Sequence, residues 1–105
     1  MTLMMVRHRI KNYQQWKKAF DDSAEVRAEY GLRDGWIHCG ATDCSDVLVA
    51  LRCDDIERAR RCLDDPECKA SMREGGVLGE VEVFFMEKVC DVPAPEPAPA
   101  LSGTA

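Results

Sequence analysis

The chain has 105 residues, 46% of them hydrophobic and 31% charged, a composition typical of one soluble globular domain. Its 14 Lys and Arg residues stand against 19 Asp and Glu residues, and the net charge of −5 argues against nucleic acid as a partner. No run approaches the ~20 apolar residues of a membrane span. The N-terminus does not have the pattern of a secretory signal, so we expect a cytoplasmic protein.

The first third of the chain predicts a strand followed by a long helix. Residues 3–8 alternate and are rich in Met and Val, which is typical of a strand. Asn12 is placed to cap a helix that we expect to run to Tyr30 and to end at Gly31. The apolar face expected for this helix comprises Tyr13, Trp16, Phe20, Ala24 and Ala28.

The middle and the end of the chain predict three more strands and a second helical region. The β-rich runs 33–39 and 46–52 flank turn-forming residues, which indicates a hairpin. Asp54 is the expected cap of the second helix, and Pro66 is placed to start a further helical segment. Residues 79–89 alternate again and predict the last strand.

The resulting order, βαββαβ, predicts an α+β ferredoxin-like sandwich with a four-stranded antiparallel sheet and both helices on one face. We expect this domain to span residues 1–90. Residues 91–105 hold four of the five prolines, and we expect them to form a disordered Pro/Ala-rich tail. A domain of this size with an uncovered apolar sheet face needs a partner or a ligand on that face.

The six cysteines have no spacing that indicates a zinc site or a redox motif. They are Cys39, Cys44, Cys53, Cys62, Cys68 and Cys90. In a reducing cytoplasm we expect them to be free thiols that fill space in the interior.

Alternation divides the strand residues between two faces of the predicted sheet, because side chains two residues apart point to the same side. The face expected under the helices is apolar and comprises Leu3, Met5, Ile37, Cys39, Val47, Val49, Leu51, Val81, Val83 and Phe85. The opposite face mixes apolar and polar groups and comprises Met4, Val6, His8, Trp36, His38, Leu48, Ala50, Arg52, Glu82, Phe84 and Met86. Ligand pockets have this mixed composition. Alternatively, the polar members stand in water at strand ends or pair with one another.

Four segments of the chain resemble a bacterial family of the dimeric α/β-barrel superfamily, whose relatives include antibiotic biosynthesis monooxygenases and small polyketide cyclases. These segments are residues 6–20, 54–60, 69–77 and 84–87. The resemblance covers residues 3–89 and implies a homodimer in which two sheets pack face to face. It also implies a pocket between the sheets for a small hydrophobic or aromatic metabolite.

For this pocket the resemblance implies oxygenase or cyclase chemistry of secondary metabolism without metal, flavin or another cofactor. His8 or His38 would remove a proton from a phenol or enol, and Arg52 would hold the resulting oxyanion. The side chains expected to bind the substrate are Met4, Val6, Trp16, Trp36, Glu82, Phe84 and Met86.

Two other functions fit the same residues. A non-catalytic binding protein would need the same apolar wall and one arginine, but neither histidine would have to titrate. A purely structural homodimer would fill the face with the partner's side chains and leave no cavity. Trp16 likewise fits either a role in substrate binding or one in packing.

Overall fold

The structure is a computed structural model that describes residues 1–97. Its elements are β1 (Thr2–Ile10), α1 (Tyr13–Asp22), α2 (Ala24–Glu29), β2 (Leu32–Cys39), β3 (Asp46–Cys53), α3 (Ile56–Asp64), α4 (Pro66–Glu74) and β4 (Val77–Glu87). The strands and helical regions follow one another as predicted, and each helical region consists of two helices. The α+β class and the ferredoxin-like architecture are therefore confirmed.

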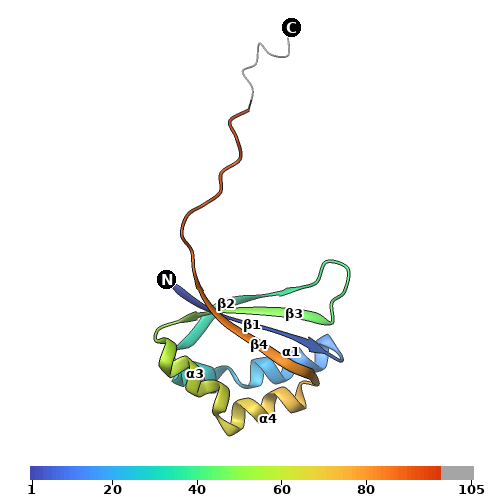
Figure 1. The fold of residues 1–105 in the computed structure, drawn as a ribbon. Coiled ribbons are helices and arrows are strands. Elements are labelled where there is room, and N and C mark those ends of the chain that lie inside the picture. Colours follow the sequence, from blue (N-terminus) through green and yellow to red (C-terminus); the bar gives the residue numbers. More distant parts are fainter. Residues whose placement is uncertain (98–105) are drawn as a thin grey trace.

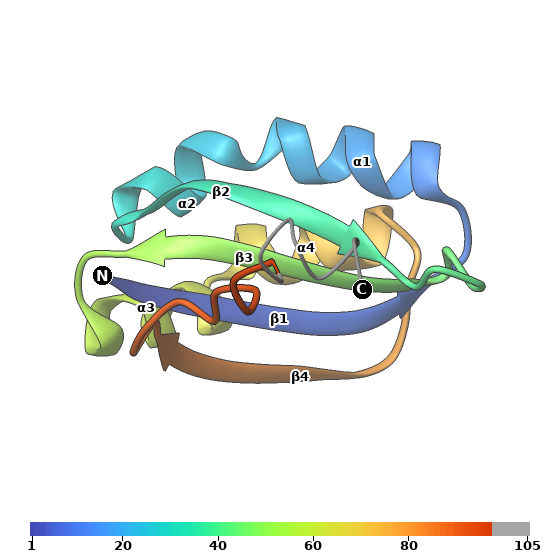
Figure 2. The ribbon, with the colours of Figure 1, turned by 90° about the horizontal axis from the view of Figure 1, so that it is seen from above.

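The four strands form one antiparallel sheet in the order β2-β3-β1-β4. All four helices cover one face of this sheet, and the other face is bare (Figure 1). Figure 2 looks onto the bare face and shows the strands side by side, with α3 and α4 behind them and α1 beyond the edge strand β2. Strands β1 and β3 lie in the middle, so their side chains form the centre of both faces.

The prediction of one helix up to Tyr30 is wrong, because the helix breaks at Ser23. The Ser23 hydroxyl donates a hydrogen bond of 3.0 Å to the carbonyl oxygen of Phe20, and Arg27 Nη1 donates to the same oxygen at 2.7 Å. Side chains thus satisfy a carbonyl that a continuous helix would use. The break turns Arg27 towards the sheet, whereas Ala24 and Ala28, predicted on the buried face, are exposed.

The helix caps follow the sequence with one shift. Asn12 Oδ1 accepts a hydrogen bond of 3.0 Å from the backbone N–H of Gln15, as predicted. The cap of α3 is Asp55 and not Asp54. The Asp54 carboxylate instead pairs with Arg33, with 3.1 Å between Oδ2 and Nη2, so the neighbouring aspartate is left to cap the helix.

The predicted face assignment is right for β2, β3 and β4 but wrong for β1. Met4, Val6 and His8 point under the helices, where their residues are 3%, 6% and 6% exposed, and they pair with the helix-facing Leu51, Val49 and Val47. At the start of β1 the odd-numbered and the even-numbered residues are both apolar, so alternation there does not show which of the two sets (the two phases of the strand) faces the helices. The end of the strand does, because its two arginines share the phase of Leu3 and Met5.

Residues 88–97 follow β4 without helix or strand and extend away from the body (Figure 1). The rest of the expected tail, residues 98–105, lies outside the described residues, so the disorder of residues 91–105 stays a prediction. None of the helices within residues 1–97 has the length and apolar character needed to cross a membrane.

Candidate functional site

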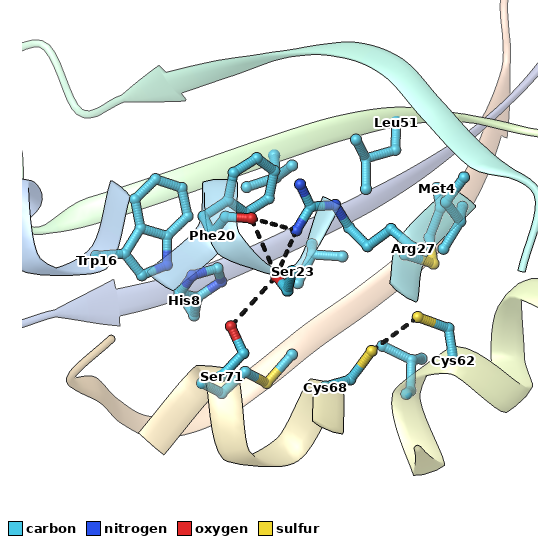
Figure 3. Close-up of a pocket in the computed structure, with 15 residues that line it drawn as sticks. Met4, His8, Trp16, Phe20, Ser23, Arg27, Leu51, Cys62, Cys68 and Ser71 are labelled. Carbon is cyan, nitrogen blue, oxygen red and sulfur yellow. Dashed lines mark hydrogen bonds between the residues drawn. The ribbon is translucent and has the colours of Figure 1, made fainter. Parts of the chain in front are cut away.

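A cavity of about 80 Å³ lies between the sheet and the helices (Figure 3). Side chains of β1, β2 and β3 form one wall, and side chains of the four helices form the other. Most of them are apolar. The lining residues are Met4, Val6, His8, Trp16, Phe20, Ser23, Arg27, Leu32, Val49, Leu51, Cys62, Leu63, Cys68, Ser71 and Met72.

His8 is the buried polar group of the sheet wall. Neither of its ring nitrogens has a hydrogen-bond partner within residues 1–97, although the residue is only 6% exposed. Burial lowers the pKa of this imidazole, so the ring is neutral at physiological pH. A neutral imidazole has one donor and one acceptor, and both are unused here. This unmet hydrogen-bonding capacity in an apolar setting is what the cavity offers a ligand.

Aromatic rings of α1 line the cavity beside this histidine. The Trp16 ring centroid lies 5.6 Å from that of His8 and 5.1 Å from that of Phe20, and the Trp16 and Phe20 rings are stacked with 23° between their planes. Trp16 is 4% exposed, so it packs in the core and lines the cavity at the same time. Such a wall suits a flat, apolar ligand.

Arg27 supplies the positive charge of the cavity. Its guanidinium lies 3.7 Å from the centroid of the Phe20 ring, and Nη1 donates to the Phe20 carbonyl oxygen and to Ser23 Oγ, each at 2.7 Å. In the part of the chain that the structure describes, no carboxylate lies within ion-pair distance of it, and burial lowers its pKa. The other N–H groups of Arg27 are therefore available to an anionic ligand.

A wider cleft of about 500 Å³ adjoins the cavity between α1, α2 and the edge strand β2. The two spaces share five lining residues, which are Phe20, Arg27, Leu32, Val49 and Leu51. The stacked pair of Phe20 and Arg27 therefore stands where the inner cavity meets the outer cleft.

The helical wall carries hydroxyl and thiol groups that sequence reasoning missed. Ser71 Oγ donates to the carbonyl oxygen of Ala19 at 2.9 Å and lies 3.2 Å from Ser23 Oγ. The sulfur atoms of Cys62 and Cys68 are 3.0 Å apart (Figure 3). The turn between α3 and α4 brings the two cysteines together. Their spacing in the sequence matches no familiar motif, so it did not reveal this contact.

The cysteines are free thiols within residues 1–97, but the prediction that they are interior filler is wrong for half of them. Cys39, Cys44 and Cys90 are exposed. Cys39 and Cys44 also lie together, with 2.8 Å between their sulfur atoms, because the β2–β3 hairpin loop folds back on itself.

The structure divides the predicted site residues between the two faces of the sheet. Those in the cavity under the helices are Met4, Val6, His8 and Trp16. Those on the bare face are His38, Arg52, Glu82, Phe84 and Met86, together with Trp36, which also lines the cleft at the edge strand β2. The prediction of one pocket containing both histidines is therefore wrong. The shifted phase of β1 places the sheet itself between His8 and Arg52.

Strand register arranges the bare face in rows across the sheet. The central row is apolar and consists of Trp36, Ala50, Met5 and Phe84. The row on one side consists of Arg52, Leu3 and Met86, and the row on the other side consists of His38, Leu48, Arg7 and Glu82. Arg7 Nη2 lies 2.7 Å from Asp46 Oδ2, beside a shallow hollow of about 260 Å³.

Within residues 1–97 no cluster of three His, Cys, Asp or Glu side chains is placed to hold a metal ion on either face.

Comparison of the sequence with protein-family models and with curated proteins finds no match. Comparison of the fold with solved structures finds many. An antibiotic biosynthesis monooxygenase aligns with a TM-score of 0.64 and 9% identity over 86% of this chain and 100% of its own.

Two further structures are similar over nearly their whole length. A variant of SnoaB, a cofactor-independent oxygenase from Streptomyces nogalater, has a TM-score of 0.65 and 12% identity, covering 89% of this chain and 97% of its own. A NIPSNAP domain protein from Burkholderia xenovorans has a TM-score of 0.60 and 21% identity, covering 90% of this chain and 100% of its own. The chain therefore has the ferredoxin-like fold of these monooxygenase and NIPSNAP structures.

Proposed function

We propose that the protein is a cofactor-independent monooxygenase or cyclase that acts on a small aromatic or polyketide-like metabolite in the cavity under the helices. The observation that carries this proposal is the buried His8 ring, which is neutral and has no hydrogen-bond partner within residues 1–97. An unsatisfied buried polar group destabilises a folded protein, and such groups are concentrated at functional sites. The fold shared with a cofactor-independent oxygenase supports the same assignment.

The reaction begins when neutral His8 takes a proton from an acidic phenol, enol or activated CH₂ group of the substrate. Arg27 then holds the oxyanion, because no carboxylate of residues 1–97 lies within ion-pair distance of it. In the oxygenase reaction the carbanion reduces O₂, so a CH₂ group and O₂ become a carbonyl group and water. In a cyclase the same carbanion attacks a carbonyl carbon, a C–C bond forms as the C=O π bond breaks, and the resulting alkoxide takes the proton back from His8.

The shape of the site favours a substrate with one ring beside His8 and a substituent that extends outwards. The inner cavity of about 80 Å³ is smaller than most ligand pockets, whereas the adjoining cleft of about 500 Å³ has the usual size. Arg27 stands at their junction, so it would hold an oxygen atom on the edge of the inner ring.

Oxygen uptake with a phenol, a naphthol and an anthrone as substrates tests this proposal. We expect His8→Phe to lower kcat/KM by roughly 100-fold or more, because general-base catalysis contributes about that much. Arg27→Met should lower it by roughly 10- to 100-fold through loss of oxyanion stabilisation. His38→Ala, on the bare face, is the matched control and should keep the wild-type rate.

Two results would contradict the proposed catalysis. If His38→Ala lost activity and His8→Phe kept it, the active site would lie on the bare face. If the wild-type protein bound the naphthol, with a change in tryptophan fluorescence, but consumed no oxygen and formed no product, the non-catalytic binding function would hold.

We also propose that a second copy of this chain covers the bare face. Within the central row Trp36 is 43% exposed, and in the next row Met86 is 51% exposed, which is unusual for large apolar side chains. Around a twofold axis along the central row, the apolar row of Trp36, Ala50, Met5 and Phe84 would face its own copy in the partner. An apolar row that packs on itself is the self-complementary arrangement that an isologous interface requires.

Phe84→Glu should convert the dimer into a monomer, because it places an unpaired charge in the central apolar row. Light scattering should report about twice 11.8 kDa for the wild type and about 11.8 kDa for the variant. Val89→Glu is the matched control, since Val89 is 94% exposed and follows the end of β4. A monomeric wild type would contradict the proposed dimer.

A further inference from the structure

We propose that Cys62 and Cys68 are a redox-active pair in the cavity wall, which hydrogen peroxide converts into a disulfide between α3 and α4. Their residues are 3% and 8% exposed, and the two sulfur atoms lie 3.0 Å apart. A disulfide has an S–S length of about 2.05 Å, so the sulfur atoms need to approach by only about 1 Å. This proposal goes beyond the proposed catalytic function and does not depend on it.

The surroundings distinguish the two thiols. Cys68 is the third residue of α4, where the positive end of the helix dipole favours a thiolate. When Cys68 is the thiolate, the S–H group of Cys62 can donate to it across the 3.0 Å contact, and this hydrogen bond lowers the pKa of Cys68, with a smaller contribution from Arg27 and against the effects of burial and Asp65. The same hydrogen bond and burial raise the pKa of Cys62. Cys68 is therefore the nucleophile and Cys62 the resolving thiol.

Oxidation proceeds in two balanced steps. The Cys68 thiolate attacks one oxygen of hydrogen peroxide, the O–O bond breaks, and a sulfenic acid and hydroxide form. The Cys62 thiol then attacks the sulfenic sulfur, the S–O bond breaks, and the disulfide and water form. Overall two thiols lose two electrons, and one peroxide becomes two waters.

The route to the sulfur atoms determines which oxidant can act. Both cysteines line the inner cavity and are almost fully buried, which favours a small oxidant such as peroxide over a bulky disulfide such as oxidised glutathione. The exposed pair Cys39 and Cys44 has no such restriction. Cys53 is buried and has no sulfur partner within residues 1–97, so it serves as an internal reference for burial alone.

Mass spectrometry of the full-length chain tests the proposal without any substitution. Trypsin cleaves after Arg61 and Lys69, so both cysteines of the cavity lie in peptide 62–69, and the hairpin pair lies in peptide 34–52. After peroxide treatment, unfolding and alkylation, we expect peptide 62–69 to be unalkylated and lighter by two hydrogens. Oxidised glutathione at the same concentration should modify peptide 34–52 and leave peptide 62–69 reduced.

Variants and stability supply the second measurement. In Cys62→Ser, dimedone should trap the sulfenic acid on Cys68, whereas Cys68→Ser should give little trapping on Cys62. In the Cys39→Ser/Cys44→Ser background, closure of the disulfide should raise Tm by roughly 5–15 °C, and dithiothreitol should reverse this. The proposal is overturned if peptide 62–69 stays fully alkylatable, or if its disulfide forms only after unfolding in urea.

Discussion

Replacing His8 with leucine is expected to raise the free energy of unfolding by about 1–3 kcal/mol, because it removes two buried ring nitrogens that have no partner within residues 1–97. Leucine fits among the apolar neighbours Met4, Val6 and Trp16. The same substitution should abolish turnover if His8 is the base. Urea denaturation at pH 7, with the slope of the transition compared between the two proteins, measures the gain.

The pH dependence of stability supplies a second signature of the same residue. Burial lowers the pKa of His8 in the folded protein below its ordinary value of 6.5. The unfolded chain therefore binds a proton more readily, and the free energy of unfolding falls as the pH drops from 6.5 towards the folded pKa. Above pH 6.5 this contribution is fully present. His8→Leu has no such pH dependence from residue 8. The variant should therefore exceed the wild type in free energy of unfolding by more at pH 5 than at pH 7.

His38→Leu is the matched control, because His38 is exposed on the bare face. It removes a histidine that lies outside the cavity under the helices, so it should not raise the free energy of unfolding as His8→Leu does. A loss of stability in His8→Leu would mean that the imidazole has a hydrogen-bonding role in the fold, and the argument for a ligand at His8 would then fail.

Local sequence patterns were sufficient to predict the fold. Alternation in the strands, the cap at Asn12 and the Asp65-Pro66 restart each depend on neighbouring residues only, and the structure contains all of them. The break at Ser23 could not be predicted in the same way. It depends on Arg27 reaching back to a carbonyl, which competes with an otherwise continuous helical pattern.

The site was harder to predict because its residues come together only in the tertiary structure. The chemistry of His8 marks it as a candidate, but the apolar start of β1 hides the phase that places it under the helices. Arg27 lines the cavity because the helix breaks at Ser23. Cys62 lies beside Cys68 because of the turn between α3 and α4. The arginines at the end of β1 and Ile10 are the one local signal that gives the correct phase.

Replacing Gly35 with alanine is expected to lower the free energy of unfolding by about 3 kcal/mol or more, because the new methyl group has no space. A Cβ atom at Gly35 would lie 1.7 Å from the carbonyl oxygen of Ala50 and 2.8 Å from the Cα atom of Leu51. These are backbone atoms of β3, so no rotamer change relieves the overlap. β2 would have to separate from β3 here, and Trp36, the next residue, would lose its place in the central row of the bare face.

Gly79→Ala is the matched control for Gly35→Ala. Gly79 has a φ of +68°, and no atom lies within 4 Å of the position that a methyl group would take, so alanine there meets backbone strain but no overlap, at about 1 kcal/mol. Thermal unfolding followed by circular dichroism should show a Tm decrease of roughly 10–25 °C for Gly35→Ala and a much smaller one for Gly79→Ala. Equal Tm decreases in the two variants would contradict the close approach of β2 to β3, because a methyl group at residue 35 would then cost no more than backbone strain alone. The larger decrease at Gly35 would show that the contact between these strands, which also forms the outer edge of the cleft beside Arg27, leaves no room for a side chain.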